Sequence, residues 1–296
     1  AAPIASPTPI SPASFMAETT AARRRPSLDQ IGRWVGGAAL AGSIAFISER
    51  LWRLDWSTLQ PHASWSLAGA MIGAPFLFAA ADRALARAWT AIVDPGRSYP
   101  PSDISRIYAR GVLMKYLPGS VFQYVSRQVE GARTGIGHKL LAKSVAIEVG
   151  LHLVSSMSVA AACLSFDRWP AAAVAAALVV IGASLAMRRS LLTALAFQIV
   201  AFGAFAAAAA LIGAAVLPTG ASLPHFAALF LLAWLAGFVV PVAPSGIGVR
   251  EAALLALAGA SLPAAGLMAA TLALRASSIV GDLGYGLVTL GRRDRI

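Results

Sequence analysis

The sequence predicts an all-α, polytopic integral membrane protein with about seven to eight transmembrane helices. Hydrophobic residues make up 58% of the 296 residues and charged residues only 12%, against about 25% charged residues in soluble domains. The apolar runs are long, rich in Ala and Gly and separated by short loops, without the alternation of a membrane β-barrel. Pro and Gly interrupt two of these runs, so we also expect two broken, re-entrant segments.

The predicted transmembrane domain follows a polar N-terminal segment. Residues 1–30 are rich in Pro, Ser, Ala and Thr and contain an arginine cluster, so we expect a disordered basic segment. Residues 31–293 then form a single transmembrane domain. Its expected spans are residues 31–46, 65–81, 140–166, 170–187, 191–217, 225–240 and 263–290, with a half-span at 251–260 and an interfacial amphipathic helix at 102–110.

The distribution of Lys and Arg predicts the orientation of these spans. The basic residues concentrate at 23–25, 83–110, 127–143, 188–189 and 292–295. All of these segments lie on one side if residues 111–127 enter the membrane and return, and that side, with both termini, is predicted to be cytoplasmic. A complete crossing by residues 111–126 would place the basic segment 127–143 outside, and we disfavour it for that reason. The net charge of +11 suits an anionic leaflet, so no nucleic-acid partner is expected.

Helix breakers define the two interrupted runs, at residues 111–127 and 230–251. The breakers are Pro118 and Gly119 in the first run, and Pro241, Pro244, Gly246 and Gly248 in the second. An unpaired backbone group in hydrocarbon costs several kcal/mol, so such a break must be wrapped in protein or line a wet cavity. In the predicted topology the two segments enter from opposite sides, as an inverted repeat would arrange them. The alternative for each is a kinked helix or a plain loop at the interface.

Charged residues also lie within or beside the apolar runs. They are Arg250, Glu251, Glu148, Arg275 and Asp282. Each costs about 2.5 to 3.5 kcal/mol at the centre of a spanning helix, so these side chains must pair or face water. Arg275 and Asp282 are about two turns apart on one helical face and can reach the same interior. We expect Glu251, Glu148, Asp282 and Arg275 to balance charge or carry protons; the alternative is that they form ion pairs that only fix the packing.

The broken segments are suited to bind an anion. A helix that begins inside the membrane directs free N–H groups and the positive end of its dipole into a cavity. Gly246 and Gly248 allow close approach of the backbone, and Arg250 can add a bidentate contact. At the first segment, Lys115, Tyr116 and Arg127 offer similar contacts. The sequence therefore predicts binding of a lipid phosphate, with membrane lipids as the partners.

Several other chemistries find no support in the sequence. A single cysteine, Cys163, excludes an intramolecular disulfide and a multi-cysteine metal site. The four histidines lack metal-ligand spacing, and His152, one turn after Glu148, is more often a hydrogen-bonded residue than part of a proton relay. The two glycines at 246 and 248 do not form a dinucleotide fingerprint, and no nucleophile elbow is present. We therefore expect no metal, no cofactor and no catalytic residue.

These segments resemble the lysylphosphatidylglycerol synthase transmembrane-region family, also called flippase-like domain proteins. The resemblance covers residues 31–293 and rests on residues 115–119 (KYLPG), Arg127, Glu148 and residues 244–251 (PSGIGVRE). It implies movement of lipids between leaflets in a bacterial cytoplasmic membrane, by a stand-alone member without the soluble synthase domain. Positions that depart from the family pattern leave the identity of the lipid open; they are Ser120, Phe122, Val149 and Ser245.

The resulting hypothesis is a lipid flippase that moves an anionic phospholipid or polyprenyl-linked glycolipid between leaflets, and not an enzyme. Two alternatives belong to other classes. A membrane-embedded transferase acting on a lipid carrier would need an acidic general base, for which Glu148 or Glu251 is the candidate. A non-transporting subunit would anchor a glycosyltransferase or another envelope-synthesis enzyme as its partner, and would have a dry interior.

Overall fold

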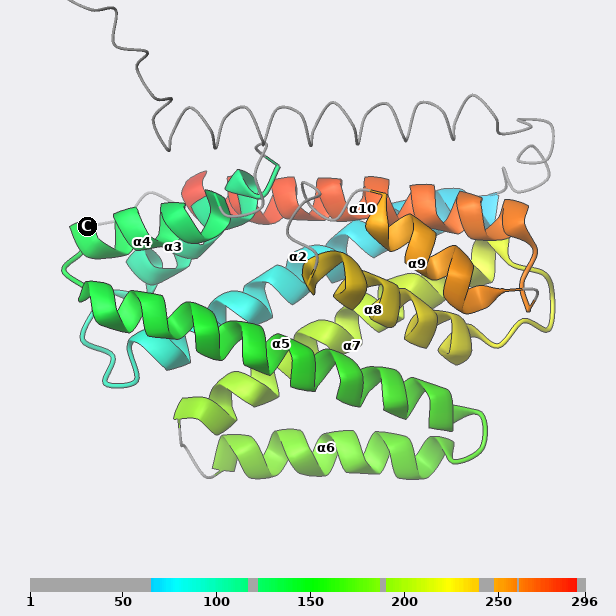
Figure 1. Ribbon diagram of the computed structural model, residues 1–296, viewed down its shortest axis with the longest axis horizontal. Coiled ribbons are helices and arrows are strands. Elements are labelled where there is room, and N and C mark those ends of the chain that lie inside the picture. The colour runs from blue at the N-terminus through cyan, green and yellow to red at the C-terminus, as the bar shows by residue number, and fades with distance from the viewer. Residues whose placement is uncertain (1–64, 117–121, 187–189, 240–247, 260, 292–296) are drawn as a thin grey trace, which may run out of the picture.

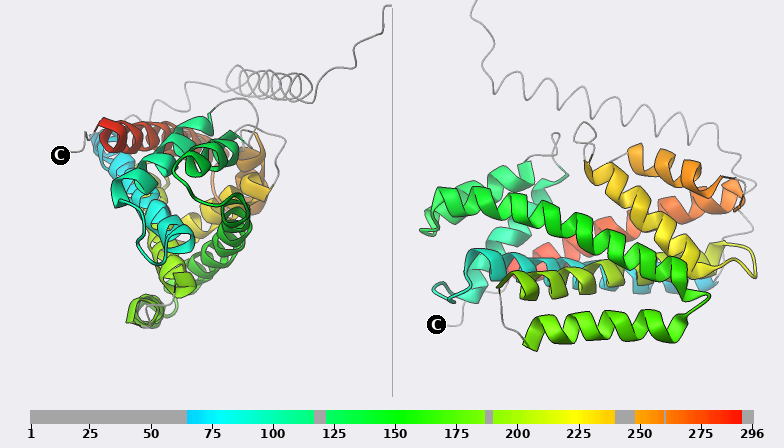
Figure 2. Two further views of the ribbon diagram at one scale, coloured as in Figure 1. Left: turned by 90° about the vertical axis from the view of Figure 1, so that its left-hand side faces the viewer. Right: turned by 60° about the horizontal axis from the view of Figure 1, so that its bottom comes forward.

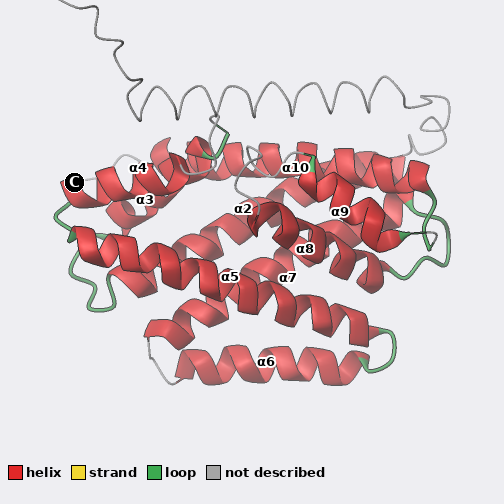
Figure 3. Cartoon of the chain, in the orientation of Figure 1, coloured by secondary structure: helices red, strands yellow, loops and turns green. Residues whose placement is uncertain are grey.

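Every regular element in the described part of the chain is an α-helix (Figure 3). The computed structural model describes residues 65–116, 122–186, 190–239, 248–259 and 261–291. The helices are α2 (Trp65–Val93), α3 (Pro101–Met114), α4 (Phe122–Arg133), α5 (His138–Phe166), α6 (Pro170–Ala186), α7 (Ser190–Val216), α8 (Leu223–Val239), α9 (Val249–Ala258) and α10 (Ala264–Gly291). The all-α prediction is confirmed for these residues. The expected N-terminal segment 1–30 and the first span, 31–46, lie outside them.

Among the described helices, four are long and apolar enough to cross a membrane: α2, α5, α7 and α10. The helices α6 and α8 are apolar but shorter. Large apolar side chains remain on the outside of the bundle, including Phe76 at 73% exposure and Leu287 at 69%. A soluble protein rarely exposes so many large apolar groups, whereas lipid tails accept them without cost. These described helices are consistent with the predicted helical membrane protein.

The long helices run roughly along the longest axis of the molecule, and the short ones form two pairs (Figure 1). The α3–α4 pair lies towards one end of this axis, and the α8–α9 pair towards the other. In both pairs the helices pack side by side. The helix α2 packs most extensively on α7 and also on α10, while α6 lies at the margin against α5 and α7 (Figure 2). Both short pairs therefore sit within a frame of long helices.

The two interrupted apolar runs become separate helices. In the first run, α3 ends at Met114 and α4 begins at Phe122. In the second run, α8 ends at Val239 and α9 begins at Val249. Gly248 precedes α9 with a φ of +85°, which side chains with a Cβ rarely adopt. The other breakers, Pro118, Gly119, Pro241, Pro244 and Gly246, lie outside the described residues.

Two helices extend beyond their expected bounds. The helix α2 continues to Val93 and not only to residue 81, because no proline or glycine intervenes before Pro95 and Trp89 near its end is buried at 1% exposure. Part of the basic stretch after residue 81 is thus helical. The helix α3 extends past both ends of the expected segment 102–110, and Ile104 and Tyr108 bury it against the bundle.

Small residues allow the long helices to approach closely. Lipid tails are as apolar as Leu, so packing in a membrane depends on close backbone contact and not on hydrophobic burial. Gly281 of α10 shows this most directly, because a Cβ placed there would lie 2.6 Å from Phe78 Cβ and 2.7 Å from the carbonyl oxygen of Pro75. Gly284, on the same helix, has no neighbour within 4 Å of such a Cβ. Gly281 therefore fixes the crossing of α2 and α10.

We predict that Gly281→Ala lowers the free energy of unfolding by about 1 to 3 kcal/mol, the usual cost of overpacking. The control, Gly284→Ala, should leave stability unchanged or raise it by up to about 1 kcal/mol, since Ala is the better helix former. Thermal unfolding midpoints in one detergent provide the comparison. Equal midpoints for the two variants would contradict the assigned crossing.

Candidate functional site

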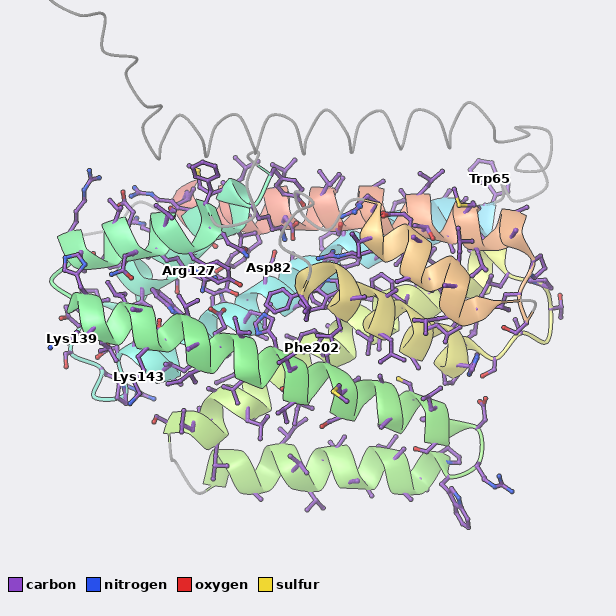
Figure 4. All side chains as sticks on the ribbon, in the orientation of Figure 1. Trp65, Asp82, Arg127, Lys139, Lys143 and Phe202 are labelled. Carbon is purple, nitrogen blue, oxygen red and sulfur yellow. The ribbon has the colours of Figure 1, made fainter. Side chains whose placement is uncertain are left out.

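A cavity of about 420 Å³ lies inside the bundle, between the two short helix pairs and the long helices. Among the described residues, its ionisable acids and bases are Asp82, Lys115, Arg127, Glu148, His152, Arg250, Glu251, Arg275 and Asp282. The four carboxylates and the four Lys and Arg side chains have cancelling formal charges. Figure 4 shows Asp82 near the middle of the bundle, and Arg127 between it and the end where Lys139 and Lys143 lie. Charged groups so placed need partners or water.

The structure brings most of the predicted site residues to this cavity. Lys115 and Tyr116, just after α3, line it together with Arg127 of α4 and Glu148 of α5. From α9 and α10, Arg250, Glu251, Arg275 and Asp282 line it. Gly248 is the N-cap residue of α9, two residues before Arg250. The expectation that Arg275 and Asp282 face one interior is confirmed. That these residues bind a lipid head group, balance charge or carry protons stays a prediction.

Arg127 and Glu148 form the most buried ion pair. Their closest atoms, Nη1 and Oε2, are 2.6 Å apart, with the side chains 7% and 3% exposed. The Tyr108 hydroxyl donates to the second Glu148 oxygen at 3.3 Å. Three aromatic rings enclose the guanidinium, with centroids 4.6 Å (Tyr108), 5.1 Å (Tyr124) and 5.6 Å (Trp89) from Arg127 Cζ. Glu148 and this cage therefore hold the charge of Arg127 in place.

Glu251 joins the start of α9 to α10. One of its carboxylate oxygens accepts from the backbone N–H of Gly248 at 2.6 Å, and the other lies 3.0 Å from Nη2 of Arg275. A glutamate in the first turn satisfies a free N–H and favours the positive end of the helix dipole. Glu251 is thus committed on both oxygens.

A third group of charges lies where α2, α10 and the end of α3 meet. Lys115 Nζ is 2.6 Å from Asp282 Oδ2, and the Tyr116 hydroxyl donates to the same carboxylate. The Asp82 side chain lies within hydrogen-bonding reach of Asp282. Sequence reasoning missed Asp82, because the expected span ended just before it. The sequence feature that could have revealed Asp82 is the absence of any helix breaker between the apolar run and Pro95, which indicates that the helix continues past residue 81.

Arg250 differs from the other three cations. No carboxylate of the described residues lies within the 4.0 Å of an ion pair from its guanidinium. Its Cζ lies 5.1 Å from the Trp234 ring centroid, and Nε is buried without a hydrogen-bond partner. Its aliphatic part lies against Gly237, where any Cβ would collide with it. Arg250 is therefore positioned by packing and stacking and retains free donors.

Aromatic rings form an apolar wall of the cavity beside Arg250. The Trp234 and Phe238 rings stack at 5.2 Å, and His152 stacks on Phe238 at 5.2 Å. His152 Nδ1 donates to the backbone carbonyl of Glu148 at 2.8 Å. Phe202 closes this cluster from α7 (Figure 4). The cavity thus has one charged side and one apolar side.

In comparisons with known proteins, no family model, curated protein or solved structure matches this chain. The arrangement of the cavity is therefore the basis for a functional proposal. Among the described residues it offers one cation without a carboxylate partner, three cations paired with carboxylates, and an aromatic wall.

We predict that Arg127→Ala lowers the free energy of unfolding by about 3 to 5 kcal/mol, because it leaves Glu148 buried without its cation. Arg133, whose side chain is 74% exposed in its pair with Glu130, is the control, and Arg133→Ala should cost about 0 to 1 kcal/mol. Denaturant titrations in mixed micelles measure both values.

A double variant tests the cause of this loss. Arg127→Met combined with Glu148→Leu removes both charges and should recover most of the lost stability, since apolar pairs of similar volume often replace buried ion pairs. If the double variant were as unstable as Arg127→Ala, packing by the arginine side chain would be the larger effect.

Proposed function

We propose that the protein is a lipid flippase or transporter that moves an anionic lipid between the leaflets of a bilayer. The observation that carries this proposal is Arg250, a cation with free donors in a cavity of a protein with an apolar exterior. The substrate class is an anionic phospholipid or a polyprenyl-linked glycolipid.

The charge arrangement supports a phosphate as the ligand. Lys115, Arg127 and Arg275 each hold a carboxylate, so their charges are largely compensated before any ligand enters. Arg250 lacks such a partner among the described residues, and a guanidinium binds phosphate through two parallel N–H donors. The stack on Trp234 orients the guanidinium plane. A phosphate would supply the anion that no described residue provides.

The start of α9 adds to this site. The first turn of an α-helix has N–H groups without intrahelical partners, and its dipole favours an anion. Arg250 lies in this first turn of α9. The Glu251 carboxylate accepts from the N–H of Gly248 only. The other N–H groups of the first turn can therefore donate to a ligand. Anion binding here uses the backbone and one side chain together.

The size and polarity of the cavity suit a lipid head group. Its volume of about 420 Å³ lies within the roughly 300 to 1,000 Å³ typical of ligand pockets. A cavity of this size can hold a head group but not the acyl or prenyl chains in addition. The aromatic wall of Trp234 and Phe238 offers an apolar surface next to the cation. A head group could bind inside while the chains stay in the surrounding bilayer.

The proposal includes the membrane arrangement. The α3–α4 and α8–α9 pairs would be the opposed re-entrant hairpins of an inverted-repeat-like domain with about seven to eight spans. Both termini would lie on the cytoplasmic side of a bacterial cytoplasmic membrane. The position of the two pairs towards opposite ends of the long axis supports this arrangement. A glycosyltransferase or another envelope-synthesis enzyme would supply or use the lipid, as in the flippase-like family that the sequence resembles.

The ion pairs favour transport over a transferase. A transferase would need Glu148 or Glu251 as a general base. Both carboxylates are held by an arginine and a second donor, which leaves neither free to accept a proton from a substrate. The charged lining likewise favours a ligand site over the dry interior of an anchoring subunit.

We predict that Arg250→Ala slows the movement of acyl-labelled phosphatidylglycerol across proteoliposome membranes by about tenfold or more, because a bidentate charged contact is lost. Gly237→Ala should slow it as well, since a Cβ there displaces Arg250. The exposed Arg168, at the turn after α5, provides the control, and Arg168→Ala should move the lipid at the wild-type rate.

The measurement is the loss of fluorescence as an external quencher reaches lipids that arrive in the outer leaflet. Mass spectrometry of co-purified lipids identifies any other anionic lipid to be labelled in the same way. Should the wild-type protein move none of them faster than empty liposomes, the proposed function would be wrong. Equal rates for wild type and Arg250→Ala would remove Arg250 from the site.

A further inference from the structure

Asp82 is a buried carboxylate that lines the cavity and takes part in none of the three ion pairs described above. It lies on α2 at 3% exposure, lines the cavity, and its Oδ2 has no hydrogen-bond partner. Figure 4 shows Asp82 in the centre of the bundle, with helices on all sides. An ionised carboxylate in this place would be costly without a cation of its own.

Asp282 of α10 is the group that Asp82 meets. The close contact of Gly281 with Phe78 and Pro75 brings the two helices together next to Asp282, and the two aspartate side chains come within hydrogen-bonding reach. Two carboxyl groups can form a hydrogen bond only if one of them carries a proton. Lys115, the cation paired with Asp282, balances one negative charge and not two.

We propose that Asp82 and Asp282 share one proton and take up a second one when the anionic lipid binds. This inference rests on the proposed function for the identity of the anion. At rest, the pair has one negative charge, which Lys115 balances. An anion at Arg250 adds negative charge close by, and this favours protonation of the second carboxyl group. Lys115 is then released from Asp282 and can face the lipid phosphate as a second cation.

The other groups around the pair are compatible with this exchange. The Tyr116 hydroxyl contacts Asp282, Tyr108 of α3 and Tyr285 of α10 interact electrostatically with Asp82, and Arg250 of α9 interacts with Asp282. The helix α7, which packs along α2, has no ionisable side chain. From α5, the Glu148 carboxylate is compensated by Arg127. Lys115 and Arg250 are thus the cations that respond to the charge of the pair.

The site suits a proton better than a metal ion. The described residues contain no group of three or more His, Cys, Asp or Glu side chains that could hold a metal. The Lys115 ammonium group also occupies the position next to Asp282, where it would repel a second cation. A proton needs neither several ligands nor the removal of Lys115.

Infrared difference spectroscopy of the full-length protein in detergent tests the inference. A protonated carboxyl group has a carbonyl band that shifts in D2O. We expect this band in the wild-type protein at neutral pH, and its absence in both Asp82→Asn and Asp282→Asn, where the single remaining carboxylate pairs with Lys115. Glu130→Gln, which changes a carboxylate of an ion pair outside the cavity, should keep the band. No band in the wild type, or a band that survives in both variants, would overturn the shared proton.

Short-chain phosphatidylglycerol then serves as the anion. Its addition should enlarge the band of the wild-type protein about twofold, as the number of protonated carboxyl groups rises from one to two. In Arg250→Ala the band should be present but should not respond to the lipid. A band that does not change when the lipid binds to the wild-type protein would overturn the second uptake. Because the resting band is measured without lipid or transport, failure of the flippase assay alone would count against the proposed function and not against the shared proton.

Discussion

The compensation of charge inside an apolar bundle is the constraint on which the cavity depends. Each buried ion pair joins a short hairpin helix, or its end, to a long apolar helix: Arg127 of α4 to Glu148 of α5, Lys115 after α3 to Asp282 of α10, and Glu251 of α9 to Arg275 of α10. An isolated charge at this depth would be costly. The ion pairs therefore fix where the two short helix pairs lie against the long helices. Among the described residues Arg250 has the Trp234 ring and no carboxylate as its partner.

Packing of small residues complements these pairs. Apolar burial does not drive helices together among lipid tails, so close contact and polar partners must do so. Gly281 sets the distance between α2 and α10, and this same crossing brings Asp82 to Asp282. Gly237 similarly gives space to Arg250 beside Trp234. The positions of the charges thus depend on the packing of uncharged residues.

Sequence reasoning predicts the helices and the charges of the site better than it predicts their partners. Continuous apolar runs and their Pro and Gly boundaries locate α5, α7 and α10 closely, because membrane helices follow hydropathy. The need to compensate buried charge predicts that Glu148 and Arg275 face the interior. It does not reveal that Glu251 pairs with Arg275, since this contact depends on how α9 packs against α10. Asp82 escapes detection because neighbouring arginines suggest the end of a span.

The helices α6 and α10 differ so much in length that one bilayer thickness would not match both if both crossed the membrane as proposed. At 1.5 Å per residue, the 17 residues of α6 measure about 26 Å, whereas the 28 residues of α10 measure about 42 Å. The hydrocarbon layer is about 30 Å thick, so one uniform thickness cannot match both helices. In the proposed arrangement, tilting of the long helices, or local thinning of the bilayer beside α6, would absorb the mismatch. None of the cavity-lining residues comes from α6, so this adjustment can vary from membrane to membrane while the interior keeps its geometry.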